Sequence, residues 1–106
     1  MKLNVYSIFD SAAKAYMSPF FMHNNGLAIR AFSDQVNSEK ENQISKHPEQ
    51  FTLFQIATYD DSTGKLEAVE TPKPLGKGNE YKEQQVEINQ LKSLIDEFKE
   101  LVNKER

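Results

Sequence analysis

The sequence has no cysteine and no tryptophan, and it contains only two histidines. The absence of cysteine excludes disulfide bonds, Cys-ligated zinc, iron–sulfur clusters and thiol catalysis. Two histidines leave little material for a histidine-based metal site, so we expect no bound metal and no other cofactor. No segment approaches the roughly 18–20 apolar residues of a membrane span, and the N-terminal residues lack the apolar core of a signal peptide. These absences predict an intracellular protein in a reducing compartment.

The residues that are present are those of a small folded domain with an appendage. The chain has 106 residues with a formal net charge of −3, and 38% of its residues are hydrophobic, which is enough for one modest core. Seven Phe and four Tyr argue against a disordered chain. The acidic balance counts against tight binding to nucleic acid, although residues 1–50 carry five basic and five acidic groups and are locally neutral.

Three β-rich segments and one amphipathic segment indicate an α+β fold. Aromatic and β-branched residues predict three strands, at residues 3–9, 51–59 and 65–69. Asn24-Asn25-Gly26 is typical of a helix start, and apolar residues between Ala28 and Val36 then recur at helical spacing. We therefore expect a small three-stranded sheet, in the order strand–helix–strand–strand, with one packed helix.

The connecting segments carry weaker signals. Residues 10–23 are expected to form a loop or a short helical turn, and residues 37–50 an exposed polar loop. Residues 71–79 contain two prolines and two glycines, which cannot continue a helix or a central strand. The resulting division of the chain is a small α+β domain at 1–70, a linker at 71–79 and a C-terminal helix at 80–106.

The C-terminal segment has the clearest periodicity. Apolar residues recur three and four apart in the heptad pattern of a coiled coil, whose positions a and d face a partner helix. Position a holds Tyr81, Ile88, Ile95 and Val102, and position d holds Gln84, Leu91 and Phe98. Leu94 and Leu101 at position g widen the stripe, which leaves open a dimer, a larger oligomer or a single helix folded back on its own sheet. We expect self-association, through Ile88, Leu91, Ile95, Phe98 and Val102.

An ordered series of short motifs covers most of the chain. It runs through Met1–Asp10, Ala13–Tyr16, Pro19–Phe21, Asn25–Arg30, Lys46–Glu49, Leu53-Phe54, Tyr59–Asp61 and Leu75-Gly76. Over residues 1–80 this series resembles the small nonstructural protein of gokushoviruses, tailless single-stranded-DNA phages of the microvirus group. The resemblance implies a DNA-binding or replication-associated phage protein in the cytoplasm of a bacterial host cell, acting in genome replication or in the switch to packaging. It supplies no catalytic residues.

The segment Lys14–Phe21 interleaves a cation with aromatic rings, the combination that single-stranded DNA requires for its phosphates and bases. The same rings would also serve to cover the edge of a thin core. Together with the resemblance, the segment predicts a nucleic-acid-binding site that consists of Lys14, Tyr16, Phe20, Phe21, Arg30 and Lys46.

Carboxylates and short glycine motifs give no support to an enzyme. Asp60 and Asp61 are adjacent in a predicted turn, where side chains diverge, whereas a magnesium site needs converging carboxylates. Gly76-Lys77-Gly78 lacks the spacing and the Ser or Thr of a phosphate-binding loop. We therefore predict a non-enzymatic protein that binds single-stranded DNA. The alternative is an adaptor that binds a host or viral protein without contacting DNA, which the acidic balance and the polar loop 37–50 would suit.

Overall fold

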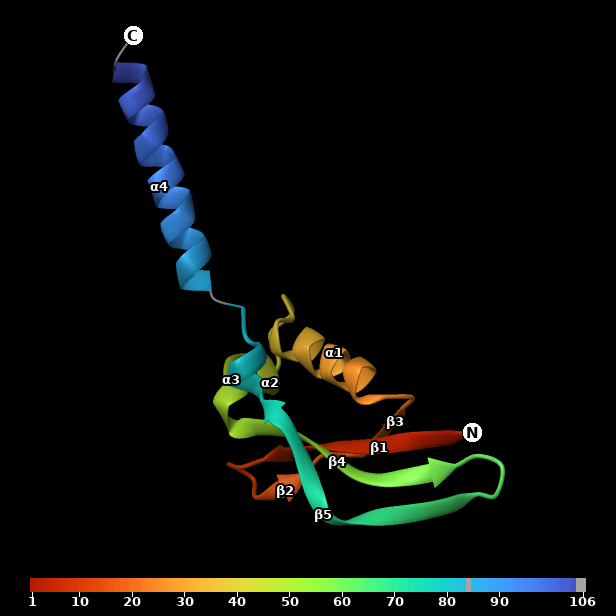
Figure 1. Ribbon diagram of the computed structural model, residues 1–106. Coiled ribbons are helices and arrows are strands. Elements are labelled where there is room, and N and C mark those ends of the chain that lie inside the picture. Colours follow the sequence, from red (N-terminus) through yellow and green to blue (C-terminus); the bar gives the residue numbers. More distant parts are fainter. Residues whose placement is uncertain (84, 105–106) are drawn as a thin grey trace.

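An antiparallel sheet of five strands forms the centre of the computed structural model, which describes residues 1–83 and 85–104 (Figure 1). The strand order is β2-β1-β4-β5, and β3 pairs with the same edge of β1 as β2. The strands are β1 (Lys2–Asp10), β2 (Ala15–Tyr16), β3 (Phe20–Met22), β4 (Phe51–Asp60) and β5 (Lys65–Lys77). The sheet curls into a half-barrel, and α1 lies over its concave side. The expected α+β class is confirmed, but the expected number of three strands is wrong.

The two additional strands, β2 and β3, lie in the segment 10–23 that was expected to be a loop. Both strands are too short to give a periodic signal. The segment that connects them has one residue more than the stretch of β1 with which they pair. The step from Tyr16 to Phe20 spans four residues, whereas their partners on β1, Phe9 and Tyr6, are three apart. The buried Ser7 hydroxyl donates a hydrogen bond of 2.6 Å to the Met17 carbonyl and so satisfies the backbone at this bulge.

The predicted linker at 71–79 is wrong, because most of it belongs to β5. Pro72 and Pro74 are compatible with a strand here because β5 lies at the edge of the sheet, where one row of N–H groups needs no partner. Four residues of β5, Val69–Pro72, oppose the single residue Ile56 of β4, and this bulge accompanies the strong bend of β5. After β5 the chain turns directly into the short helix α3 (Gly78–Tyr81).

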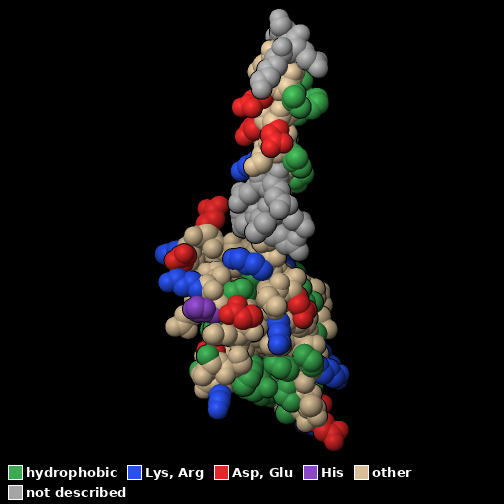
Figure 2. Space-filling model, turned by 90° about the vertical axis from the view of Figure 1, so that its left-hand side faces the viewer, with side chains coloured by type: hydrophobic (Ala, Val, Ile, Leu, Met, Phe, Trp, Pro, Cys, Tyr) green, Lys and Arg blue, Asp and Glu red, His purple; other side chains and the backbone are tan. Residues whose placement is uncertain are grey.

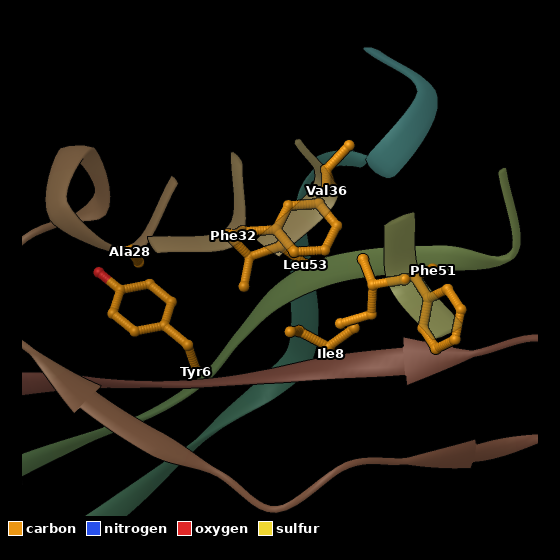
Figure 3. Packing of buried hydrophobic residues seen from close by; sticks show 8 residues of the cluster. Tyr6, Ile8, Ala28, Phe32, Val36, Phe51 and Leu53 are labelled. Atoms are coloured by element: carbon orange, nitrogen blue, oxygen red, sulfur yellow. The ribbon is translucent and has the colours of Figure 1, made fainter. Parts of the chain in front are cut away.

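The predicted amphipathic helix is confirmed as α1 (Asn25–Val36). The Asn24 side chain caps it by accepting a hydrogen bond of 2.9 Å from the Leu27 N–H. One face of α1 packs against side chains from β1 and β4, as Figure 3 shows. The buried cluster consists of Tyr6, Ile8, Ala28, Phe32, Val36, Ile44, Phe51 and Leu53. We call the side of the sheet that α1 covers the inner face.

The segment 37–50 is not an exposed loop, because it contains a short helix and a 3₁₀ turn that close one end of the core. These are α2 (Gln43–Lys46) and η1 (Pro48–Gln50). Asn42 and Ser45 form a reciprocal capping box at the start of α2. Ile44 is the one apolar side chain of α2, and it is buried in the core cluster. A single apolar residue in a polar segment gives no periodicity, which explains the wrong prediction.

The expected C-terminal helix is present as α4 (Gln85–Lys104) and extends away from the sheet (Figure 1). Every side chain described on it, from residue 91 to residue 103, is exposed. The alternative of a helix folded back on its own sheet therefore does not describe α4. The side chains of Ile88 and Gln84, two of the predicted heptad residues, lie outside the described part. No helix in the described part of the chain is long and apolar enough to span a membrane.

The segment that leads into α4 is tied to the end of α1 by one amide side chain. Asn37 donates hydrogen bonds from Nδ2 to the carbonyl oxygens of Ser33 (3.0 Å) and Tyr81 (2.9 Å), and its Oδ1 accepts one from the Glu83 N–H (2.8 Å). The Lys82 ammonium donates a hydrogen bond of 3.2 Å to the Val36 carbonyl at the C-terminus of α1. These contacts fix the chain up to residue 83 against the helical layer.

We expect Asn37→Ala to lower the free energy of unfolding by about 1–3 kcal/mol, because partly buried backbone groups lose their hydrogen-bond partner. Urea denaturation followed by circular dichroism measures this change. Asn103→Ala removes an amide at an exposed position of α4 and serves as the control. Equal unfolding midpoints for the two variants would contradict the anchoring role of Asn37.

Candidate nucleic-acid interface

The strand register defines a second face of the sheet, opposite α1, which we call the outer face. Successive side chains of a strand point to opposite sides. Since Tyr6 and Ile8 of β1 lie in the core beneath α1, Val5 and Phe9 lie on the outer face. Residues directly opposite each other in an antiparallel pair share a face. By this rule the outer face includes Phe9 with Tyr16, Val5 with Phe21, Leu3 with Tyr59, Ser7 with Phe54, and Ala57 with Ala68.

Aromatic rings gather in two places on the outer face. Phe9, Tyr16 and Phe54 form an aromatic triad, with ring centroids 4.9 Å apart for Phe9 and Tyr16 and 5.7 Å apart for Tyr16 and Phe54. Phe21 and Tyr59 form a pair with centroids 5.5 Å apart. Tyr16 is 47% exposed and Phe21 is 49% exposed, so each group presents a ring to solvent although it packs on its neighbours.

Apolar side chains connect the two aromatic groups. Val5 and Ala57 are buried on the outer face, and Leu66 of β5, opposite Tyr59, is exposed. Figure 2 shows hydrophobic side chains gathered on the part of the molecule farthest from α4, with basic and acidic side chains at the border. Larger exposed apolar surfaces of this kind mark binding sites on monomeric proteins.

A lysine in a constrained turn lies next to the aromatic triad. Lys14 ends the turn between β1 and β2 and has a φ of 56°, a conformation unfavourable for a residue other than glycine. The Asp10 carboxylate stabilises the turn by accepting hydrogen bonds from the N–H groups of Ala12 (3.0 Å) and Ala13 (3.3 Å). Lys77 of β5, opposite Thr52, occupies an outer-face position beyond the triad. The aromatic triad therefore has a cationic position on each side, one at the β2 edge and one on β5.

The structure divides the six residues predicted to bind DNA. Tyr16 and Phe21 lie on the outer face, and Lys14 lies in the turn that leads into β2, next to Tyr16. Phe20 lies on the inner face, where its ring stacks on buried Tyr6 with centroids 5.7 Å apart. Arg30 is exposed on α1 and Lys46 is exposed on α2, both in the helical layer. Lys46 also forms an ion pair of 3.6 Å with Glu41.

Sequence reasoning did not identify Phe9, Phe54 and Tyr59 as part of this surface. The signal was the alternation within their strands, which assigns Leu3, Val5 and Phe9 to one face. This alternation does not show which face of the sheet α1 covers or which strands are neighbours. Each aromatic group arises from strand pairing, which brings Phe54 and Tyr59 of β4 next to rings of the N-terminal strands.

The adjacent carboxylates of the β4–β5 turn are engaged by a cation of the chain itself. The Met1 ammonium lies 2.7 Å from Asp61 Oδ1 and 3.8 Å from Asp60 Oδ1. The hydrogen bond with this ammonium lowers the pKa of Asp61 and raises the pKa of the ammonium. Within the described residues, no group of three or more His, Cys, Asp or Glu side chains is arranged to hold a metal ion.

Comparison with known protein families finds a match over most of the chain. A family model described as "Phage ORF5 protein" matches residues 3–81. No curated protein and no solved structure matches the chain. The matched segment contains all five strands and the helices α1 to α3, and therefore the whole outer face, whereas α4 lies beyond it.

Proposed function

The chain belongs to the Phage ORF5 protein family, and on this premise we propose that it is a non-enzymatic phage accessory protein that binds single-stranded DNA on its outer face. The setting we propose is genome replication, or its switch to packaging, in a single-stranded-DNA phage of the gokushovirus type. The observation that carries the proposal is the presence of half-exposed rings, Tyr16 and Phe21, on one sheet face, with Lys14 in the turn next to Tyr16.

Single-stranded DNA fits such a surface because its unpaired bases are free to stack. Stacking of a base on an aromatic ring contributes about 1–3 kcal/mol, and a sheet face that presents rings is a common platform for it. The triad and the Phe21–Tyr59 pair lie along β1 at Phe9 and Val5. Four residues of a strand correspond to about 13 Å, a distance that an extended single strand spans with a few nucleotides. Lys14 and Lys77, which lie on either side of the triad, then contact phosphates at that end of the surface.

The composition of the outer face supports binding without base preference. Its register positions hold mainly aromatic and aliphatic side chains, such as Leu3, Phe54 and Leu66. Every base has a π face, whereas base readout needs hydrogen-bonding groups directed at base edges. We therefore expect similar affinities for single strands of different sequence and weaker binding of duplexes, whose bases are already stacked.

Fluorescence anisotropy with labelled single-stranded and double-stranded DNA, repeated over a salt series, tests this function. We expect saturable binding that prefers the single strand and weakens with salt. Lys14→Glu should weaken binding several-fold and reduce the slope of log K against log salt by about 0.7, the value for one phosphate contact on a single strand. Lys46→Glu, on α2 in the helical layer, is the matched control and should leave the slope unchanged. Absence of saturable binding at low salt would refute the proposal.

An adaptor that binds a protein partner is the second candidate. It is favoured by the aliphatic part of the outer face around Leu66 and by the net charge of −3. Such a partner would bury the same rings by apolar contact, and its binding would respond weakly to salt. Two results together would fit this candidate. The wild-type protein would not bind DNA, and Leu66→Asp would abolish binding of a phage or host protein that the wild-type protein captures.

A further inference from the structure

α4 carries an apolar stripe that is open to solvent along its described length. Between residues 91 and 103, six large apolar side chains each expose between 41% and 67% of their surface. They are Leu91, Leu94, Ile95, Phe98, Leu101 and Val102. All six occupy heptad positions d, g and a, which are adjacent on a helix. Figure 2 shows hydrophobic side chains along one side of α4 and acidic side chains along the other.

Between residues 91 and 103 the charged side chains at the two borders of the stripe have opposite signs. Lys92 and Lys99 occupy position e, which adjoins position a at one border. Glu97 occupies position c, which adjoins position g at the other border, and Lys104 follows at the same position where the helix ends. Asp96 and Glu100 lie on the far side of the helix. One helix therefore presents an apolar strip with a basic edge and an acidic edge.

We propose that α4 binds the α4 helices of other copies of this chain in a parallel bundle, with the apolar stripe inside. When copies run parallel around a common axis, the basic edge of each helix faces the acidic edge of the next, so Lys99 approaches Glu97 of the neighbouring copy. In an antiparallel pair the two basic edges would face each other and bring Lys92 near Lys99 of the second copy. Like charges in that position are unfavourable. This charge pattern makes the helix complementary to itself in one orientation.

The bundle is independent of the proposed function, but it has a consequence for it. A parallel arrangement collects the sheets of all copies at the N-terminal end of the bundle, because each α4 follows its sheet in the chain. Several outer faces would then act on one DNA strand, and the second binding event would become intramolecular. This consequence rests on the proposed function, and loss of DNA binding alone would leave the bundle intact.

The molar mass of the full chain in solution tests the bundle. By light scattering we expect at least twice the monomer mass of 12.2 kDa, and the monomer mass for Ile95→Asp combined with Phe98→Asp. Ser93→Asp combined with Asn103→Asp adds the same charge on the side away from the stripe and should keep the oligomer. A monomeric wild-type chain at its highest soluble concentration, or an unchanged mass for the first variant, would overturn the proposal.

Orientation can be tested separately, since the chain has no cysteine. In a parallel bundle Val102 lies next to Val102 of a second copy, so Val102→Cys should form disulfide-linked dimers rapidly under mild oxidation. Asn103→Cys, one position along and outside the stripe, should crosslink slowly. An oligomer in which Val102→Cys does not crosslink faster than Asn103→Cys would refute the parallel arrangement.

Discussion

Gly78→Ala is expected to lower the free energy of unfolding by about 2–3 kcal/mol, although it adds only one methyl group. Gly78 is buried at the start of α3, and a Cβ atom there would overlap the Pro48 carbonyl oxygen and lie 3.0 Å from the Pro48 Cα. These are backbone atoms of η1, so no side chain can move aside. Either η1 or α3 must shift, and both pack against the same end of the core. Urea denaturation measures the loss.

Gly26→Ala is the matched control for this substitution. Gly26 lies in the first turn of α1, where an added Cβ would lie 3.3 Å from the Asn24 side chain, and alanine is favoured over glycine in helices. We expect its free energy of unfolding to equal or exceed that of the wild-type protein. If Gly78→Ala were as stable as Gly26→Ala, close contact between α3 and η1 would not be what requires glycine at this position.

Gly76 also allows close packing, in this case against a side chain. Its φ is 140°, and a Cβ atom would lie 2.7 Å from the ring and the hydroxyl of Tyr81. The Tyr81 hydroxyl donates a hydrogen bond of 2.6 Å to the Leu75 carbonyl, so the ring is fixed in this place. The two glycines thus allow the end of β5 and α3 to pack closely. The same residues suggested a linker in the sequence, because glycine serves flexibility and close packing equally well.

Local signals account for the parts of the fold that could be predicted. The strands β1 and β4 and the helix α1 each contain their own pattern of apolar residues. The side chain of Asn24 caps α1 by accepting a backbone hydrogen bond, as the Asn-Asn-Gly sequence predicts. The elements that were missed have no such pattern. β2 and β3 exist because β1 offers them an edge, and α2 exists because Ile44 fills a place in the core that other segments enclose. Tertiary contacts determine the secondary structure of these segments.

The candidate interface was predicted in part for the same reason. Tyr16 and Phe21 were identified from the aromatic content of one segment, but Phe20 was grouped with Phe21 although neighbours in a strand point to opposite faces. The strand assignment that separates them depends on pairing with β1. Arg30 and Lys46 lie in the helical layer, and this placement follows from packing that a single sequence does not encode locally.

Tyr16→Ala combined with Phe21→Ala is expected to weaken binding of single-stranded DNA by about 30-fold or more. Each substitution removes one ring that is half exposed on the outer face, and each lost base stack costs about 1–3 kcal/mol. The salt dependence of binding should stay the same, because no phosphate contact is removed. Anisotropy titrations measure both quantities, and thermal unfolding shows whether the sheet remains folded.

Two further variants separate stacking from apolar contact. Tyr16→Phe combined with Phe21→Tyr keeps both rings and should bind DNA within a few-fold of the wild-type protein. Leu66→Ala removes an exposed apolar side chain from the same face without removing a ring, so it should leave DNA binding unchanged. If Leu66→Ala reduced binding as much as the double alanine variant, apolar contact and not base stacking would account for the interaction. The outer face would then fit a protein partner better than a nucleic acid.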